Sequence, residues 1–336
     1  MLSANLAGTA TPIDWKTIVE AHERIRPHIH RTPVLTSHSL DALAGAQLFF
    51  KCENLQKTGS FKIRGATNAL FSLTDDEIRR GVLTHSSGNH GAAIACAARW
   101  RGTSAFVVMP KNAPAVKCRA VEGYGGKITF CEPNVTSRSE TAARIQAETG
   151  AVMIHPYDDD RIIAGQSTAA KEFLEDLPDL DAVLSPVSGG GLLSGTCLGT
   201  KGQKSSVRVF GCEPERADDA YRSWKSGKLQ PLETSDTIAD GLRASLAPRT
   251  FAILKKFLDG VLLVSETDIV RAMKLVWERM KIVVEPSSAV ALAPMLRAGG
   301  FKEIAASELR GKAAARIGVI LSGGNVELDW SNYPMR

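Results

Sequence analysis

The chain alternates short, continuously apolar runs with longer segments whose apolar residues have helical spacing. The apolar runs that we predict to be strands cover residues 47–52, 81–84, 105–109, 127–131, 151–154, 181–186, 207–212, 261–264 and 316–321. A continuous apolar run is typical of a strand that is buried on both faces of a parallel sheet. Strands of this kind that alternate with helices predict an α/β protein with a doubly wound, mostly parallel architecture.

The strand predictions also suggest how the chain divides. Residues 81–158 hold a series of strand and helix patterns that is long enough to form a layer of its own. We therefore expect a smaller, mobile domain of residues 81–158, inserted into a larger domain made of residues 1–80 and 159–336. The 336 residues suffice for two such domains with a large core.

Composition limits the possible partners. The 41 Lys and Arg residues against 36 Asp and Glu residues give a formal net charge of +5, and no dense basic run occurs. This mild excess suits small anionic ligands and gives no support for nucleic-acid binding. No apolar run approaches the roughly 20 residues that a membrane-spanning helix needs, so we expect no membrane partner.

The cysteines point to a reducing compartment. The six cysteines lie far apart and form no Cys-x-x-Cys pair, which gives no support for a zinc site or a thioredoxin-type motif. The first residues lack the basic and apolar regions of a secretory signal. We therefore expect a cytoplasmic protein.

A lysine lies in a segment with strong local signals, KTGSFKIRGA at residues 57–66. A strand pattern precedes this segment and a helical pattern follows it. Ser60 is predicted to be the N-cap residue, which puts Lys62 in the first turn of the helix. The positive end of the helix dipole favours loss of the lysine proton, and a neutral amine is a nucleophile. The alternative for Lys62 is an ordinary surface lysine.

A glycine-rich segment, VSGGGLLSG at residues 187–195, follows the strand at 181–186 and begins a helical pattern. Successive glycines let backbone N–H groups converge, and a helix start adds positive potential, so the segment favours a phosphate site. The alternative is a tight strand-to-helix turn. The spacing is neither the dinucleotide-binding motif nor a P-loop.

Two further loops carry polar groups after strand patterns. The loop SSGNHG at residues 86–91 offers hydroxyl, amide and imidazole groups that suit a carboxylate, although a helix cap would explain part of the set. We take the preceding His85 as a structural residue. Ser322 follows the strand at 316–321, at the carboxyl end where α/β folds bind ligands. From that segment alone, however, a simple turn is the better interpretation.

An acidic cluster lies at residues 213–219, where four carboxylates occur within seven residues. Carboxylates at this density repel one another unless a cation or a helix N-terminus relieves them. The cluster is therefore read either as ligands for a hard divalent cation or as the acidic start of a helix.

Together these segments resemble the fold-type II pyridoxal 5′-phosphate enzymes, in the branch of serine/threonine dehydratases and serine racemases. The resemblance covers about residues 13–330. It implies two open, twisted, mostly parallel sheets with helices on both faces.

The resemblance implies pyridoxal 5′-phosphate as the cofactor, bound covalently through Lys62. The other residues that it implies for cofactor binding are Phe61, Asn89, Ser188, Gly189, Gly190, Gly191, Leu192, Gly241, Glu285 and Ser322. Asn89 matches the residue that bonds the 3′-oxygen of the ring, and Ser322 matches the serine at the ring nitrogen.

The resemblance also implies residues for substrate and metal. Those matching the substrate site are Ser86, Ser87, Asn89, His90 and Arg138. Ser87 is implied to be the second catalytic residue, on the side of the substrate opposite Lys62. The divalent-metal site of the racemase branch matches Glu213, Ala217 and Asp219, which implies Mg²⁺, Mn²⁺ or Ca²⁺.

We therefore expect a dehydratase of the ammonia-lyase class that converts a β-hydroxy amino acid to a 2-oxo acid and ammonia. Serine, threonine and 3-hydroxyaspartate are the candidate substrates. The alternative is a serine or aspartate racemase that uses Lys62 and Ser87 as acid and base on the two sides of Cα. The resemblance also suggests a homodimer.

Three other functions have weaker support. A β-replacement enzyme, such as a cysteine synthase, shares the fold but has a different asparagine loop. A non-catalytic cofactor-binding sensor would not need the paired Lys62 and Ser87. A nicotinamide dehydrogenase would need the dinucleotide-binding motif, which is absent.

Overall fold

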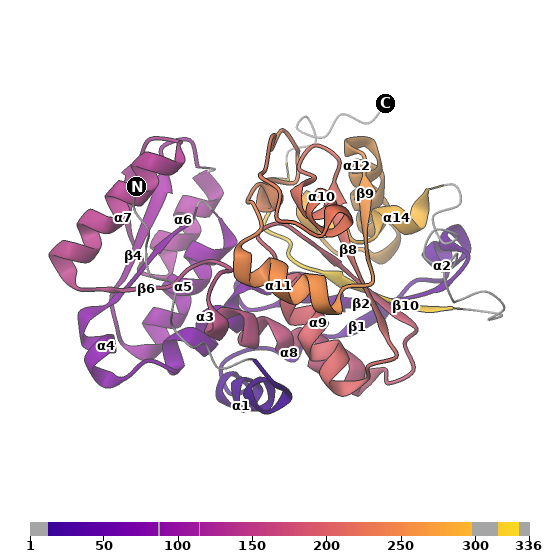
Figure 1. Cartoon of the computed structure of the whole chain (residues 1–336), viewed down its shortest axis with the longest axis horizontal. Coiled ribbons are helices and arrows are strands. Elements are labelled where there is room, and N and C mark those ends of the chain that lie inside the picture. The colour runs from indigo at the N-terminus through magenta and orange to yellow at the C-terminus, as the bar shows by residue number, and fades with distance from the viewer. Residues whose placement is uncertain (1–12, 87, 114, 298–314, 329–336) are drawn as a thin grey trace.

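The computed structural model describes residues 13–297, except 87 and 114, and residues 315–328. Ten strands of this part form two open sheets (Figure 1). The larger sheet has the order β1-β2-β10-β7-β8-β9. Its strands are β1 (Val34–Thr36), β2 (Gln47–Cys52), β7 (Ala182–Pro186), β8 (Arg208–Pro214), β9 (Gly260–Val264) and β10 (Arg316–Leu321). Only β1 is antiparallel to its neighbour.

The smaller sheet is entirely parallel and has the order β5-β4-β3-β6. Its strands are β3 (Val82–His85), β4 (Ala105–Pro110), β5 (Lys127–Cys131) and β6 (Val152–Met153). It lies at the left of Figure 1, and the larger sheet lies at the right. The architecture is α/β with two open and mostly parallel sheets, as expected.

Each predicted strand coincides with a strand of the structure to within a few residues. Burial explains this success, since every residue of β7 is buried, as a continuous apolar run requires. The strand β1 was not predicted, because its three residues at the antiparallel edge are too few to give a pattern. The division into domains of residues 81–158 and of residues 1–80 with 159–336 stays a prediction.

Helices cover both faces of each sheet. The longer ones are α1 (Trp15–Ile25), α3 (Lys62–Phe71), α5 (Asn89–Arg101), α6 (Ala115–Gly123), α7 (Val135–Thr149), α8 (Asp160–Asp176), α9 (Gly191–Gln203), α10 (Asp219–Ser226), α11 (Pro248–Phe257) and α12 (Glu266–Leu275). The shorter ones are α2 (His38–Ala44), η1 (Glu53–Leu55), α4 (Asp75–Arg80), η2 (Asp240–Leu242), η3 (Val276–Met280), α13 (Pro286–Ala289) and α14 (Ala293–Leu296). Within the described residues no helix is both long and apolar enough to cross a membrane.

A row of four helices connects the two sheets. The helix α5 packs on the smaller sheet and on α3, α3 packs on α8, and α8 packs on α9, which covers the larger sheet. The row runs across the middle of the molecule in Figure 1. The crossing of α3 and α8 is very close, because a Cβ atom at Gly165 would lie 2.6 Å from the Cα of Gly65. This row holds the loops of both sheets around one central cavity.

Candidate active site

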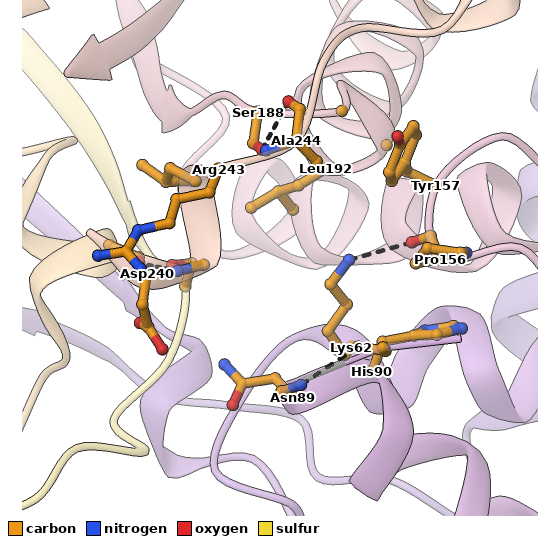
Figure 2. A pocket seen from close by; sticks show the side chains of 18 of the residues that line it. Lys62, Asn89, His90, Pro156, Tyr157, Ser188, Leu192, Asp240, Arg243 and Ala244 are labelled. Carbon is orange, nitrogen blue, oxygen red and sulfur yellow. Dashed lines mark hydrogen bonds between the residues drawn. The ribbon is translucent and has the colours of Figure 1, made fainter. Parts of the chain in front are cut away.

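A cavity of about 380 Å³ lies between the two sheets, where loops from both meet. The predicted site residues that line it are Phe61, Lys62, Ser86, Asn89, His90, Arg138, Ser188, Gly189, Gly190, Gly191, Leu192, Gly241, Glu285 and Ser322. Figure 2 shows several of them around the open space. Segments that are far apart in sequence thus meet at one cavity. Ligand sites of α/β folds are built in this way, from loops at the carboxyl ends of parallel strands. The predicted catalytic residue Ser87 lies outside the described residues.

Lys62 is the first residue of α3, and its side chain points into the cavity (Figure 2). Its Nζ atom donates a hydrogen bond to the carbonyl oxygen of Pro156 at 3.0 Å. The surrounding protein removes the amine from water and lowers the pKa of Lys62 to about 8, although the nearby Glu285 carboxylate acts in the opposite direction. An amine with this pKa is neutral in a substantial fraction of molecules near neutral pH, so it can act as a nucleophile or a base.

The prediction that Ser60 is the N-cap of this helix is wrong. The N-cap residue is Phe61, which has a helical backbone conformation and makes no side-chain capping bond. Ser60 instead pairs with Gly323 in an isolated β-bridge, and its hydroxyl is buried without a hydrogen-bond partner among the described residues. Ser60 therefore pairs with the segment after β10 and does not cap α3. Lys62 nevertheless lies in the first turn, as expected.

The glycine-rich loop connects β7 to α9. Gly190 has a φ of 90°, a left-handed conformation that favours glycine, and it is the N-cap of α9 without any side-chain cap. The Tyr157 ring lies so close that a Cβ atom at Gly189 would be 2.5 Å from it. The first N–H groups of α9 have no side-chain acceptor at Gly190, and such groups bind anions. Ser188 turns its hydroxyl to the backbone of Ala244, with both bonds at 3.0 Å.

Amide and carboxyl side chains from both sheets meet on another side of the cavity. The Nδ2 of Asn89, on α5, donates to the Oε1 of Glu285 at 2.8 Å, and the Asn89 Oδ1 accepts from the Nδ2 of Asn325 at 3.0 Å. Burial raises the pKa of Glu285 to about 7, and its second oxygen has no hydrogen-bond partner among the described residues. The hydroxyl-bearing Ser322 follows the buried end of β10 and also lines the cavity.

Imidazole and phenol rings form a row of edge-to-face contacts beside the cavity. The rings of His85 and His155 meet edge to face with centroids 5.3 Å apart, and the rings of His155 and Tyr157 do so at 4.6 Å. Burial lowers the pKa of His155 to about 4 and that of His90 well below its ordinary value, so both imidazoles are neutral near pH 7. His85, expected to be structural, also lines the cavity.

Arg138 supplies a positive charge beside these rings. It lines the cavity from α7. Burial is the main cause of the lowered pKa values of His85 and His155, and the charge of Arg138 lowers both further. No carboxylate of the described residues forms an ion pair with it. A guanidinium without a protein partner is suited to bind an anionic group of a ligand.

Sequence reasoning missed several residues of the cavity. Lys117 on α6 forms an ion pair with Asp240 on η2, so this pair joins the helices of the smaller sheet to those of the larger one. Pro156 lies beside the Lys62 amine in Figure 2, and Tyr157 lies nearby. Nothing in the sequence indicates that Lys117 pairs with Asp240 or that Tyr157 lies at the glycine-rich loop. Only the three-dimensional contacts identify them.

The predicted metal ligands lie elsewhere, between β8 and α10. The two oxygens of the buried Glu213 accept from the N–H groups of Ala220 at 3.0 Å and Tyr221 at 2.8 Å, which is how a carboxylate caps a helix N-terminus. Burial raises the pKa of Glu213 well above its ordinary range and that of Asp219 to about 6. Ala217, which lies between these two residues in the sequence, is also buried.

Both readings of this acidic cluster thus have support. The capping bonds agree with the acidic start of a helix. In the described part of the chain no group of three or more His, Cys, Asp and Glu side chains is arranged to hold a metal ion. However, a site that used the backbone oxygen of Ala217 would need only the two carboxylates, and neither of them has an ion-pair partner among the described residues.

Comparison with known proteins gives consistent results. Residues 25–323 match the family model described as pyridoxal-phosphate dependent enzyme. The chain is 50% identical over 315 residues to the β-hydroxyaspartate dehydratase of Paracoccus denitrificans, covering 94% of this chain and 97% of the relative. It is 49% identical over 318 residues to the serine racemase of Dictyostelium discoideum, covering 94% and 96%.

A solved structure gives the same picture. The structure of maize serine racemase superposes with a TM-score of 0.90 at 47% identity, and the match covers 94% of each chain.

Proposed function

Because the chain belongs to the pyridoxal-phosphate dependent enzymes of fold type II, in the branch of serine racemases and serine/threonine dehydratases, we propose that it is a dehydratase. It would convert a β-hydroxy amino acid to a 2-oxo acid and ammonia, the reaction of an ammonia-lyase. The observation that carries the proposal is the Lys62 amine, held in the cavity with a pKa of about 8. An amine of this kind can take the proton from Cα of an amino acid.

The residues of the cavity fit the cofactor. The open N–H groups at the start of α9 suit its phosphate, and the close approach of Tyr157 and Thr250 to Gly189 and Gly190 leaves space for no side chain there. Lys62 would bind the aldehyde carbon, Ser322 would face the ring nitrogen and Asn89 the 3′-oxygen. When bound, the cofactor supplies an electron sink for the charge left on Cα after proton removal.

The residues around the ring favour elimination. With the cofactor bound, the Ser322 hydroxyl, in place of a carboxylate, would leave the ring nitrogen largely unprotonated, so charge on Cα would be stabilised less. Loss of the β-hydroxyl together with the Cα proton would then be the easier route. Lys62 would take the Cα proton and give it to the departing β-hydroxyl, which leaves as water. Asn89 and Glu285, bonded to each other at 2.8 Å, would fix the orientation of the site.

The positive charge of the Arg138 guanidinium favours a substrate that has a second carboxylate. Since no carboxylate of the described residues pairs with Arg138, and His85 and His155 beside it are neutral, a side-chain carboxylate of the substrate would be its partner. Among the candidates, 3-hydroxyaspartate has this group and serine and threonine do not. The similarity to a β-hydroxyaspartate dehydratase supports the same choice.

Racemisation is the second candidate. Racemases of serine in other organisms are similar to this chain at 43–49% identity. A racemase needs an acid on the side of Cα opposite Lys62, and Ser87 is the residue that we propose for this role. The racemase would use the same cavity and the same cofactor.

The test is to incubate the purified holoenzyme with each stereoisomer of 3-hydroxyaspartate, and with L-serine, D-serine and L-threonine. The 2-oxo acid, the ammonia and the enantiomeric composition of the remaining amino acid are measured. We expect oxo acid and ammonia in equal amounts, formed fastest from a 3-hydroxyaspartate isomer. Inversion without oxo acid would favour the racemase, and no change in any substrate would contradict both.

We further propose a divalent cation, Mg²⁺, Mn²⁺ or Ca²⁺, bound by Glu213, Asp219 and the backbone oxygen of Ala217. The raised pKa values of the two buried carboxylates support it, because a cation would relieve their repulsion. We also propose that the protein is a cytoplasmic homodimer and that its smaller domain, residues 81–158, is mobile. The free state of all six cysteines agrees with a reducing compartment.

A further inference from the structure

Four charged side chains are buried together behind α3, on the side away from the cavity. Arg64, Lys51 and Glu53 have no exposed surface, and Glu172 is 2% exposed. They come from α3, β2, η1 and α8, and we call them the buried charge cluster. Its two cations and two carboxylates balance, so no net charge is left in the core.

Arg64 is at the centre of the buried charge cluster. Its Nε and Nη2 donate to the two oxygens of Glu53 at 2.7 and 2.8 Å, and its Nη1 and Nη2 donate to the two oxygens of Glu172 at 2.9 and 2.8 Å. The remaining N–H bonds the hydroxyl of Thr168 at 3.1 Å. All five guanidinium hydrogens are thus used, and two paired forks fix the plane of the group.

The other members hold the carboxylates in place. Lys51 donates to Glu172 at 2.8 Å and to the Thr32 carbonyl at 2.9 Å, and the Thr32 hydroxyl donates to Glu53 at 2.6 Å. His22 lies 3.9 Å from Glu172, and burial lowers its pKa, so it adds no charge near neutral pH.

Stability alone does not account for such an arrangement. Replacing a buried ion pair by well-packed apolar residues is often neutral or stabilising, because the charges lose their hydration. Ion pairs of this geometry fix the relative positions of the helices and strands that carry them. The helix fixed here is α3, which begins with Lys62.

The other hydrogen bonds at the start of α3 are made mostly by backbone groups. Ser60 pairs with Gly323, and the N–H of Gly65 donates to the Gln166 side chain at 3.2 Å, while the N-cap residue Phe61 makes no side-chain capping bond. Because each helical residue turns by about 100°, Lys62 and Arg64 are about 200° apart and point to opposite sides of the first turn. The bonds of Arg64 therefore set the rotation and height of the turn that carries Lys62.

We propose that Arg64 is a positioning residue for Lys62: through the buried charge cluster it sets where the Lys62 amine lies in the cavity. This inference depends on the proposed role of Lys62 as the residue that binds the cofactor covalently. The charged and titratable groups around that amine are Glu285, His90 and His155, and none of them belongs to the buried charge cluster. A shift of the first turn moves the amine relative to all three and to the Pro156 carbonyl.

The experiment uses holoenzyme with the substitutions Arg64→Lys and Thr168→Val. Arg64→Lys keeps the charge but loses the paired hydrogen bonds to the two carboxylates. Thr168→Val removes only one hydroxyl, which accepts from Arg64 and donates to the Gly165 carbonyl at 2.7 Å. It is the milder change and keeps the inference testable if Arg64→Lys does not fold. The control is Val209→Ala in the buried core of β8, which lowers the thermal midpoint without touching α3. The readouts are the visible circular dichroism per bound cofactor, the rate constant of cofactor release by hydroxylamine, kcat and KM.

We expect Arg64→Lys to lower kcat about tenfold or more with KM changed less than about twofold, since a small displacement of a reacting group costs rate without loss of binding. The dichroism falls and hydroxylamine releases the cofactor faster. Thr168→Val gives smaller changes in the same direction, and Val209→Ala matches the wild type. Unchanged dichroism and release in both Arg64→Lys and Thr168→Val would overturn the inference, as would equal changes in Val209→Ala.

A different result is expected if Lys62 is not the residue that binds the cofactor covalently. If Lys62→Ala still forms a covalent, borohydride-reducible bond with the cofactor, Lys62 is not the cofactor lysine and the inference about Arg64 falls with it. If Lys62→Ala loses that bond while the Arg64 and Thr168 variants behave as the wild type, only the positioning role is wrong.

Discussion

At the scale of single residues, Lys62 carries the strongest expectation. Its amine lies in the cavity with a lowered pKa. We predict that Lys62→Ala abolishes the visible absorption band of the bound cofactor and lowers turnover by at least about a thousandfold, because both covalent attachment and proton removal are lost. The neighbouring Lys57→Ala is the control and keeps the band. Absorbance spectra with and without borohydride provide the measurement.

The pH dependence of kcat follows from the same amine. Only the neutral form can accept the Cα proton, and the pKa of Lys62 is about 8, so kcat rises with pH, reaches half of its maximum near pH 8 and levels off about one pH unit above that. The Glu285 carboxylate raises the pKa of Lys62, so Glu285→Gln moves the midpoint to lower pH. A profile of kcat from pH 6 to 10 measures both. A plateau that is already reached at pH 6.5 in the wild type is incompatible with this reading.

We expect Arg138 to distinguish acidic from neutral substrates. A hydrogen bond to a charged group contributes about 2 kcal/mol, so Arg138→Met lowers kcat/KM for 3-hydroxyaspartate about 30-fold and that for serine by less than about threefold. Arg144→Met on the same helix, where Arg144 pairs with Glu148 at 2.9 Å on the exposed surface, is the control. Equal losses for both substrates would mean that Arg138 does not bind the side-chain carboxylate.

What a sequence can predict differs among these residues. The loops that meet in the cavity were recognisable because glycines, serines and an asparagine follow apolar runs. The pairing of Lys117 with Asp240 was not, since it joins positions 123 residues apart. The capping prediction for Ser60 failed for a related reason: a backbone pairing with Gly323, which local propensity does not record, takes Ser60 out of the helix start.

At the scale of elements, the start of α10 carries the proposed cation site. We predict that a chelator lowers the thermal midpoint by about 5 °C, because a ligand that binds only the folded state stabilises it. Asp219→Asn abolishes this response without removing the visible cofactor band. Glu215→Gln, in the same acidic cluster but exposed, keeps it. Thermal unfolding with and without chelator and added Mg²⁺ is the measurement, and an unresponsive wild type would contradict the proposal.

Strands were the elements most readily predicted. Continuous burial gives a parallel strand a signal that needs no knowledge of its neighbours, and all but β1 were expected. The order of the strands was beyond reach, because nothing local in residues 316–321 indicates pairing with both β2 and β7.

At the scale of the whole molecule, the two sheets are joined across the cavity by side chains as well as by helices. Lys117 on α6 pairs with Asp240 on η2, and Asn89 on α5 bonds Glu285. We predict a coupling of about 1 kcal/mol in the free energy of unfolding between Lys117→Met and Asp240→Asn, since directly paired residues are not additive. Urea unfolding of the single and double variants measures it.

The exposed pair Lys111 and Glu132 provides the control for this cycle. Both side chains are more than half exposed, so the same analysis should give a coupling near zero. Additive effects of Lys117→Met and Asp240→Asn would mean that their contact contributes nothing across the cavity.

The position of β10 has a consequence for biosynthesis. This strand lies between β2 and β7, which precede it by more than 100 residues in the sequence. During translation, the facing edges of those two strands stay without their common neighbour until residue 321 has left the ribosome. Until then the nascent chain exposes two unpaired strand edges. Ser322, which we propose to face the ring nitrogen, has also not yet been synthesised. We therefore expect the cofactor to bind in its final environment only after translation has passed that point.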